Sequence, residues 1–568
     1  MRRVRKIEGR TAELTRHFFR RFFENDVIQS GADTITTVVR AISIVAAPGL
    51  MFGFFLQTQY PQRPLWGRIE DEYFYVLFSF VAMASVAVFE WEMLFPDRLD
   101  FLVLGPLSLK PLQMLAAKAT ALGLFLGLFL VASNTFGMIV VPLLNGRPHF
   151  ARLIGVHAAA VMMAGVFGAM LIAGLGGLLL CVLPARLFRT VSPLMQMLTV
   201  AALALMVIHY ARFGDSMQAM LTMASGTMSP GGFSDAARWM PSFWFLGVYQ
   251  RLLYGPAAPA FAAPMTRYAV WATCGAVALV LVTYPLAWVR MRRMAMEGEG
   301  GVGKQANRLA TAVTHWIIRR PEERAVFHFI GQTIARNSRY QVYLAMYCGA
   351  GLALSIACAT TMRVSGGYAQ PGLSVFGLHA VMPLLLFWIV AGLRMAFAFP
   401  LLLQARWVFR VTGADLHPCM AAARKWAFGC GLGLLLLILL ALRCAGWHGR
   451  ALAVQAVCGF CLCAVLVEGF FFAQNSLPFS KPRSPGKTSL PLMLTLYVGV
   501  LPPFVFGMIV MTIRTEKDLW LLVWPLLAVP LLHYAAGALR EQSVTVEEER
   551  EDGGGEIQLL GLSGDLTA

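Results

Sequence analysis

The chain has 568 residues, of which 58% are hydrophobic and only 14% are charged, and its mean hydropathy is +0.64. Soluble globular proteins carry charge on about a quarter of their residues, so this composition excludes that class and predicts an all-α polytopic membrane protein. The net charge of +17 needs no nucleic-acid partner, because it fits the excess of Lys and Arg in the cytoplasmic loops of membrane proteins.

Apolar runs long enough to cross a bilayer recur along the whole chain. A helix needs about 20 apolar residues to cross a hydrocarbon core about 30 Å thick. Twelve such runs lie near 35–57, 74–95, 116–143, 153–183, 192–211, 268–289, 341–361, 374–399, 426–442, 451–473, 490–512 and 519–538. With a cytoplasmic N-terminus, most of the 47 Lys and Arg fall on cytoplasmic segments, so both termini are expected inside.

The first segment, 1–34, is basic and aromatic. Its Lys and Arg alternate with Leu14, Phe18, Phe19, Phe22 and Phe23. A basic helix with an aromatic face is typical of a lipid interface, so we expect an interface helix over 11–30 and membrane lipids as its partners.

A joint of about twenty residues, 95–115, separates the second and third expected spans. Pro96, Gly105, Pro106 and Pro111 cut it into one or two short helices with mixed apolar and charged residues. The pattern predicts a half-buried helix at the cytoplasmic membrane face, which a soluble partner can grip.

The long external segment 212–267 is unusually apolar. Trp239, Phe243 and Trp244 lie in a run too short to cross the membrane and too apolar for water. We expect this run to dip into the outer leaflet or cap an external opening, the alternative being a folded external loop.

The same order of features recurs in the second half. A second interface helix is expected over 315–336, a cytoplasmic joint at 404–424 and six further spans, so the two halves form parallel repeats of one orientation. The expected organisation is a basic N-terminal segment, a first six-helix half, a basic linker, a second six-helix half and a disordered acidic and Gly-rich tail, at 1–34, 35–290, 291–340, 341–540 and 541–568.

Motifs for catalysis are weak. Residues 298–304 resemble part of a phosphate-binding loop, but Gln305 replaces the hydroxyl residue, and the similar 486–488 has Lys481 in place of the first glycine. Cys458, Cys461 and Cys463 lie within an apolar span and are interpreted as packing residues. We therefore expect no enzyme activity, no cofactor and no metal.

Ionisable residues near the cytoplasmic ends of the spans suggest a gate. Glu90 and Glu92 end the second span, and Arg394 lies near the end of the eighth. One hypothesis is that they pair and close a cytoplasmic gate; the other is that each reaches separately toward water.

The architecture resembles the membrane subunits of ATP-binding-cassette exporters of the type 2 permease class. The run from Leu94 to Asp100, followed by Leu104 to Leu107, is similar to the joint of bacterial members. The resemblance implies coupling helices in the joints 95–115 and 404–424, separate P-loop ATPase subunits and the bacterial inner membrane. The residues that it implies at the ATPase contact are Phe95, Asp97, Arg98, Asp100, Lys110, Arg406, Arg410 and Asp415.

Two other classes of function fit the same spans. One is an ATP-independent membrane protein, either a lipid scramblase or scaffold or a component of envelope synthesis. The other, a secondary carrier, usually keeps a carboxylate near the bilayer midplane, and none is evident here. The second half also departs from the resemblance, because its external joint 514–518 is too short for a re-entrant element.

Overall fold

The structure is a computed structural model of the chain. It describes all residues except 1, 24–33, 58–61, 92, 96–97, 105, 108, 146–149, 224–239, 298–317, 366–367, 399–415, 473–478, 480–489 and 553–568.

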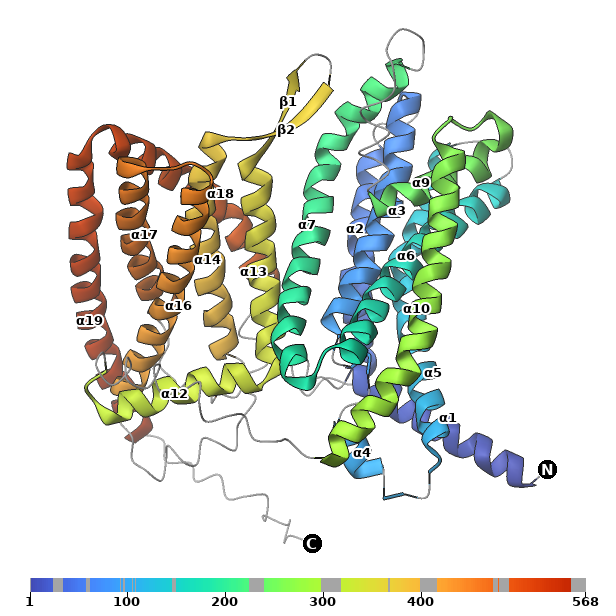
Figure 1. Cartoon of the computed structure of the whole chain (residues 1–568), viewed down its shortest axis with the longest axis horizontal. Helices are drawn as coiled ribbons and strands as arrows, with labels where there is room; N and C mark the ends of the chain where they lie inside the picture. The colour runs from blue at the N-terminus through green and yellow to red at the C-terminus, as the bar shows by residue number, and fades with distance from the viewer. Residues whose placement is uncertain are drawn as a thin grey trace, which may run out of the picture. The chain divides into compact units, whose positions relative to one another are not determined.

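The protein is an all-α multi-pass membrane protein, and the described residues include a single β-hairpin (Figure 1). Within the described residues, ten helices are long and apolar enough to cross a membrane. These segments are Gly67–Phe89, Pro111–Leu144, Phe150–Val182, Leu187–Tyr210, Ala262–Arg293, Tyr340–Ala359, Val375–Phe397, Pro418–Cys444, Gly449–Phe470 and Leu519–Leu539. Each of the ten overlaps one of the twelve expected spans, and the other two expected spans overlap the helices α2 (Thr34–Gln57) and α18 (Leu490–Lys517).

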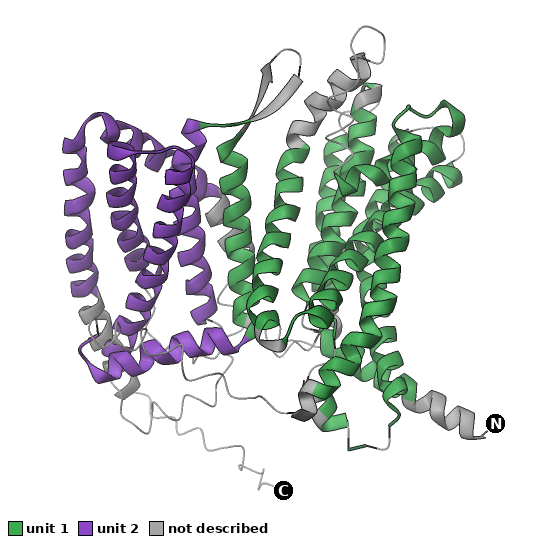
Figure 2. Ribbon diagram, viewed as in Figure 1, with its two compact units in different colours: residues 1–307, 338–374, 484–488 green, residues 308–337, 375–483, 489–568 purple. Residues whose placement is uncertain are grey.

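The chain divides into two compact units (Figure 2). Unit 1 contains α1 (Arg2–Phe23), α2 (Thr34–Gln57), α3 (Leu65–Phe89), α4 (Arg98–Leu104), α5 (Pro111–Asn145), α6 (Phe150–Val182), α7 (Ala185–Met223), α9 (Pro241–Tyr254), η1 (Gly255–Ala257), α10 (Ala262–Glu297), α13 (Ser338–Ala359), β1 (Thr360–Ser365) and β2 (Tyr368–Leu373). Unit 2 contains α12 (Pro321–Arg336), α14 (Val375–Ala398), α16 (Leu416–Cys444), α17 (Gly449–Phe470), α18 (Leu490–Lys517), η3 (Leu519–Leu522) and α19 (Val523–Asp552).

In unit 1, α3 and α6 form the centre. α3 packs against α5, α6, α7 and α9, while α6 also packs against α10. A Cβ added at Gly168 would lie 2.7 Å from the Phe80 carbonyl oxygen, so glycine is needed for this approach of α6 to α3. Close approach through small residues is the usual way in which membrane helices associate.

The helix α13 belongs to unit 1 and packs along α7. A Cβ added at Gly349 would lie 2.7 Å from the Met197 carbonyl oxygen, which again marks a close backbone approach. The expected division of the chain at 340 therefore does not coincide with the division between the units, because 338–374 belong to unit 1.

In unit 2, α14 and α17 take the central places. α14 packs against α16, α17 and α18, and α17 also packs against α16 and α19. The interface helix α12 lies against α16, as α1 lies against α5 in unit 1.

Three elements differ from the sequence-based expectation. The hairpin of β1 and β2 was not predicted; it pairs Thr360 with Leu373 and Ser365 with Tyr368 across a two-residue connection. The helix α7 continues to Met223, beyond the expected span 192–211 and into the expected external segment 212–267. The acidic stretch 541–552 was expected to be disordered, but it continues α19, because no Gly or Pro interrupts it before Gly553.

Candidate functional site

The joint between α3 and α5 is held by a buried ion-pair network around Asp100 of α4. The side chain of Asp100 is 1% exposed, and its Oδ2 lies 2.8 Å from Nζ of Lys118 on α5. Its Oδ1 pairs with the guanidinium of Arg21 on α1. Since burying one unpaired charge is costly, the three side chains tie α4, α1 and α5 to one another.

The interface helix α1 presents its aromatic face to this network. Phe18 and Phe22 are buried, and the ring of Phe22 stacks on Phe125 of α5 with centroids 4.7 Å apart. Nζ of Lys118 lies 5.3 Å from the centroid of the Phe18 ring, within range of a cation–π contact. The predicted interface helix therefore also packs against the end of the bundle in unit 1.

Aromatic contacts brace the joint against α10. The ring of Phe101 meets the ring of Trp288 edge-on, with centroids 5.2 Å apart, and the ring centroids of Phe95 and Tyr284 are 5.6 Å apart. The guanidinium of Arg290 donates hydrogen bonds to the carbonyl oxygens of Cys181 and Leu183, at the end of α6. α4 is thus supported by α1, α5 and α10 (Figure 1).

Among the side chains of the joint that the structure describes, apolar residues and one lysine are exposed. Val103 is 66% exposed and Leu107 is 53% exposed, and Lys110 is exposed beside them. Phe95 and Asp100, which the resemblance places at the ATPase contact, are instead buried within the joint. Asp97 lies outside the described residues, and Arg98 begins α4, its side chain outside the description.

In unit 2, the predicted contact residues Arg406, Arg410 and Asp415 lie outside the described residues. The neighbouring helices carry an ion pair between Lys425 of α16 and Glu323 of the interface helix α12. In unit 2 the lysine of α16 thus pairs directly with α12, whereas in unit 1 Lys118 of α5 and Arg21 of α1 are joined through Asp100 of α4.

Phe479 anchors the connection between α17 and α18. It is 1% exposed, and its φ of 65° is unusual for a residue other than glycine. Its backbone N–H donates to the carbonyl oxygen of Phe397 at 2.9 Å, and its ring contacts Phe397 and Phe329. These contacts join α12 and α14 at this connection.

The hypothesis of a cytoplasmic gate stays a prediction. Glu90 follows the end of α3 in unit 1, and Arg394 lies in the last turns of α14 in unit 2. Glu92 lies outside the described residues.

At the other end of unit 1, the apolar run that was expected on the external side lies in the short helix α9. Phe243 is 1% exposed, Trp244 is partly buried and Trp239 lies outside the described residues. Ser242 hydrogen-bonds Tyr73 of α3 at 2.9 Å, and Gln250 donates to the Glu72 carboxylate. α9 is therefore anchored to the start of α3, as a cap would require.

The start of α3 also holds a second charged contact. Arg63 forms a bidentate pair with Asp71, with distances of 2.6 and 3.0 Å to the two carboxylate oxygens. Tyr210 of α7 donates a hydrogen bond to the carbonyl oxygen of Glu70 at 3.4 Å.

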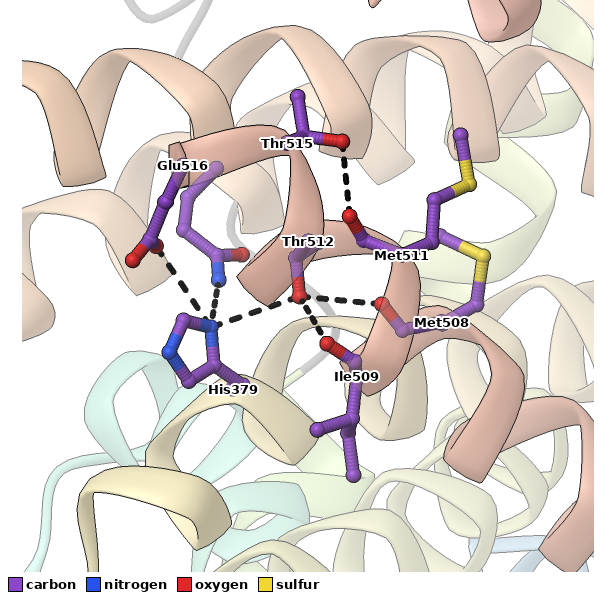
Figure 3. A network of polar contacts seen from close by, with 8 residues as sticks. His379, Met508, Ile509, Met511, Thr512, Thr515 and Glu516 are labelled. Atoms are coloured by element: carbon purple, nitrogen blue, oxygen red, sulfur yellow. Dashed lines mark hydrogen bonds and ion pairs between the residues drawn. The ribbon is translucent and has the colours of Figure 1, made fainter. Parts of the chain in front are cut away.

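Unit 2 contains a polar network that no sequence motif indicated (Figure 3). Nδ1 of His379, on α14, lies 2.8 Å from Nε2 of Gln455, 3.4 Å from the Thr512 hydroxyl and 3.7 Å from Oε1 of Glu516. The ring of Trp447 meets His379 edge-on at 4.7 Å. Because the amide nitrogen of Gln455 is a donor, Nδ1 accepts, and the proton of a neutral ring lies on Nε2.

Glu516, in the last turn of α18 beyond the apolar run, is the acidic member of this network. Burial raises the pKa of its carboxyl above the ordinary 4.5, and nearby Arg450 partly opposes this rise. Ionising Glu516 therefore costs more in the folded than in the unfolded protein, so its ionisation lowers stability as pH rises through the raised pKa.

We expect Glu516→Gln to raise the unfolding temperature of the purified chain at neutral pH. The difference from the unsubstituted protein should shrink as pH falls and vanish below 4.5, where the carboxyl is protonated in both states. Thermal unfolding between pH 4 and 8 measures this, with the exposed Glu322→Gln on α12 as the control. An equal difference at every pH would contradict the assignment to ionisation.

Among the described residues, no group of three or more His, Cys, Asp or Glu is placed to hold a metal ion. Cys458, Cys461 and Cys463 are buried and form no disulfide. No protein-family model, curated protein or solved structure matches this chain.

The sequence analysis did not predict that Lys118 and Arg21 pair with Asp100. Only Lys118 occupied a position that suggested a buried ion pair. Lys118 falls within the expected span 116–143, where an ionisable side chain needs a buried partner. Arg21 carried no such signal, because it is one of many basic residues on α1.

Proposed function

We propose that the chain is the membrane permease of an ATP-driven exporter, with both termini on the cytoplasmic side of a bacterial inner membrane. It has no ATPase motif and would take its energy from separate P-loop ATPase subunits. The observation that supports this most directly is the braced joint: Asp100 fixes α4 to α1 and α5, while Val103 and Leu107 stay exposed. A short helix fixed on several long helices can pass a push on to all of them.

We also propose that the two halves are parallel repeats with twelve spans in all, α2 and α18 being the two beyond the ten. The order of packing supports this. α3 contacts α5, α6 and α7, and α14 contacts the corresponding α16, α17 and α18. The pairs of α1 with α5 and α6 with α10 likewise correspond to α12 with α16 and α17 with α19.

In this mechanism the ATPase dimer pushes on the joints 95–115 and 404–424, and the bundle alternates between openings on the two sides. The exposed apolar pair Val103 and Leu107, next to Lys110, would be the first contact, with Asp100 positioning it from inside. Glu90, Glu92 and Arg394 would close the inner side, and α9 would cap the outer side in the first half.

Affinity purification of the chain from its native membrane tests the proposal. We expect a P-loop ATPase to co-purify, and to be lost on Val103→Glu or Leu107→Glu, because a charge in the apolar centre of the contact would lose its hydration. Leu187→Glu is the matched control. It is an equally exposed leucine, 52%, in the first turn of α7, just after the α6–α7 connection at the same end of the bundle.

Absence of any ATPase from the unsubstituted chain would favour the ATP-independent class instead. Retention of the ATPase by both joint variants, with intact folding, would exclude α4 as the contact. Asp97→Lys and Arg98→Glu extend the test to the start of α4.

A further inference from the structure

A groove of about 660 Å³ lies between the interface helix α1 and the outer face of α5. Its wall on α1 includes Thr15, Arg16 and Phe19, and its wall on α5 includes Thr120 and Leu124. Phe18 and Arg21, which hold the Asp100 joint from α1, do not line this groove. The groove is therefore separate from the joint, although it shares α1 with it.

One end of the groove is suited to an anion. Arg16 is exposed and presents a guanidinium, which binds phosphate well because its donors can form paired hydrogen bonds. The hydroxyls of Thr15 and Thr120 donate to the carbonyl oxygens of Thr11 and Ala116 in their own helices. Because both hydroxyl hydrogens are used within the helices, the guanidinium of Arg16 is the group that would bind the anion at this end.

The electrostatic surroundings favour a ligand with net negative charge. α1 contains eight Arg and Lys and only two Glu, and Arg20 is exposed one turn beyond Arg16. Such a concentration of positive charge attracts acidic headgroups more strongly than zwitterionic ones.

Beyond Thr120, the same face of α5 continues as an open strip of small and apolar residues, Gly123, Leu124 and Gly127, which we call the furrow. Gly123 and Gly127 follow Thr120 on the same face, and no atom lies within 4 Å of a Cβ added at either position. The side chain of Leu124 is 56% exposed beside them. The furrow leads away from the start of α5 at Pro111, toward the middle of the expected span.

We propose that this groove binds one anionic phospholipid, with its phosphate on Arg16 and one acyl chain along Gly123, Leu124 and Gly127. The cationic site lies at the expected cytoplasmic face, and the furrow runs from there into the expected span. A lipid of the cytoplasmic leaflet has its headgroup and its acyl chains in the same order. The bound lipid bridges α1 and α5, and so clamps α1 in the position that supports the joint. Binding of this lipid requires neither the transported substrate nor an ATPase.

Native mass spectrometry of the full chain, delipidated and then titrated with phosphatidylglycerol or phosphatidylcholine, tests the site. We expect one phosphatidylglycerol to bind more tightly than phosphatidylcholine and to raise the unfolding temperature. Arg16→Gln should weaken phosphatidylglycerol binding about tenfold, as expected for loss of one charge-assisted phosphate contact. Arg152→Gln, which removes an exposed arginine from α6, is the charge control.

A second variant tests the furrow without touching the charge. Gly127→Leu should fill the open space and weaken binding of the long-chain lipid while leaving a short-chain analogue unaffected. Inorganic phosphate should neither stabilise the protein nor compete with the lipid, because it lacks the acyl chain. Equal binding of the two lipids, or unchanged binding by Arg16→Gln, would overturn the proposal.

Discussion

Replacing Asp100 by Asn should destabilise the purified chain by about 3–5 kcal/mol, the range for breaking a buried ion pair. Asn has nearly the same shape, so packing is kept and the charge alone is removed. Nζ of Lys118, which lies 2.8 Å from the carboxylate on a side chain only 3% exposed, would then be a buried charge without its counter-ion. Chemical or thermal unfolding in detergent micelles measures the loss.

The companion substitution Lys118→Met separates charge from packing. In the double variant the buried lysine charge is gone and only Arg21, whose side chain is 26% exposed, has lost its Asp100 carboxylate, so we expect it to recover part of the stability that Asp100→Asn loses. Lys110→Met, at an exposed lysine of the same joint, should change stability by no more than about 0.5 kcal/mol. If Asp100→Asn unfolds at the same temperature as the unsubstituted chain, the network does not hold the joint.

The existence of the long helices could be predicted because membrane spans are a matter of length and hydropathy. Their ends could not, because these depend on partners from distant segments. The second span was expected to begin near Phe74, but α3 begins at Leu65. Its polar first turns are stable because Arg63 pairs with Asp71, and Gln250 of α9 donates to Glu72.

The burial of Asp100 in the joint could not be predicted from the pattern of charges. The pattern predicted a half-buried helix, and the resemblance placed Asp100 at its contact with an ATPase. The structure buries it, because α1 and α5 bring Arg21 and Lys118 to its two oxygens. Periodicity along one helix cannot show which lysine of a later helix will reach it.

The polar network of unit 2 was still less accessible from the sequence. His379, Gln455 and Glu516 are separated by more than fifty residues each, and each alone is ordinary near a helix end. Only the packing of α14 against α17 and α18 brings them together. The packing of α13 against α7 was equally inaccessible from the sequence, because it depends on how the surfaces of these two helices fit together.

Gly247→Ala should destabilise unit 1 by about 1–3 kcal/mol through overpacking. The added Cβ would meet Cβ of Met265 and lie 3.1 Å from the Ala262 carbonyl oxygen, both part of the rigid start of α10. Helix propensity alone predicts the opposite sign, since alanine stabilises a helix interior by about 1 kcal/mol relative to glycine. A measured loss would therefore report on the close approach of α9 to α10.

The matched control is Gly275→Ala on α10, where no atom lies within 4 Å of the added Cβ and stability should stay equal or rise. α9 packs near the start of α10, whereas Trp288, near its end, contacts the joint. Under the proposed mechanism Gly247→Ala should therefore lower export while leaving ATPase co-purification intact. The joint variants Val103→Glu and Leu107→Glu, in contrast, should lose the ATPase. Loss of the ATPase together with export would mean that the cap and the joint do not act separately, because damage at one end of α10 would then disturb the other.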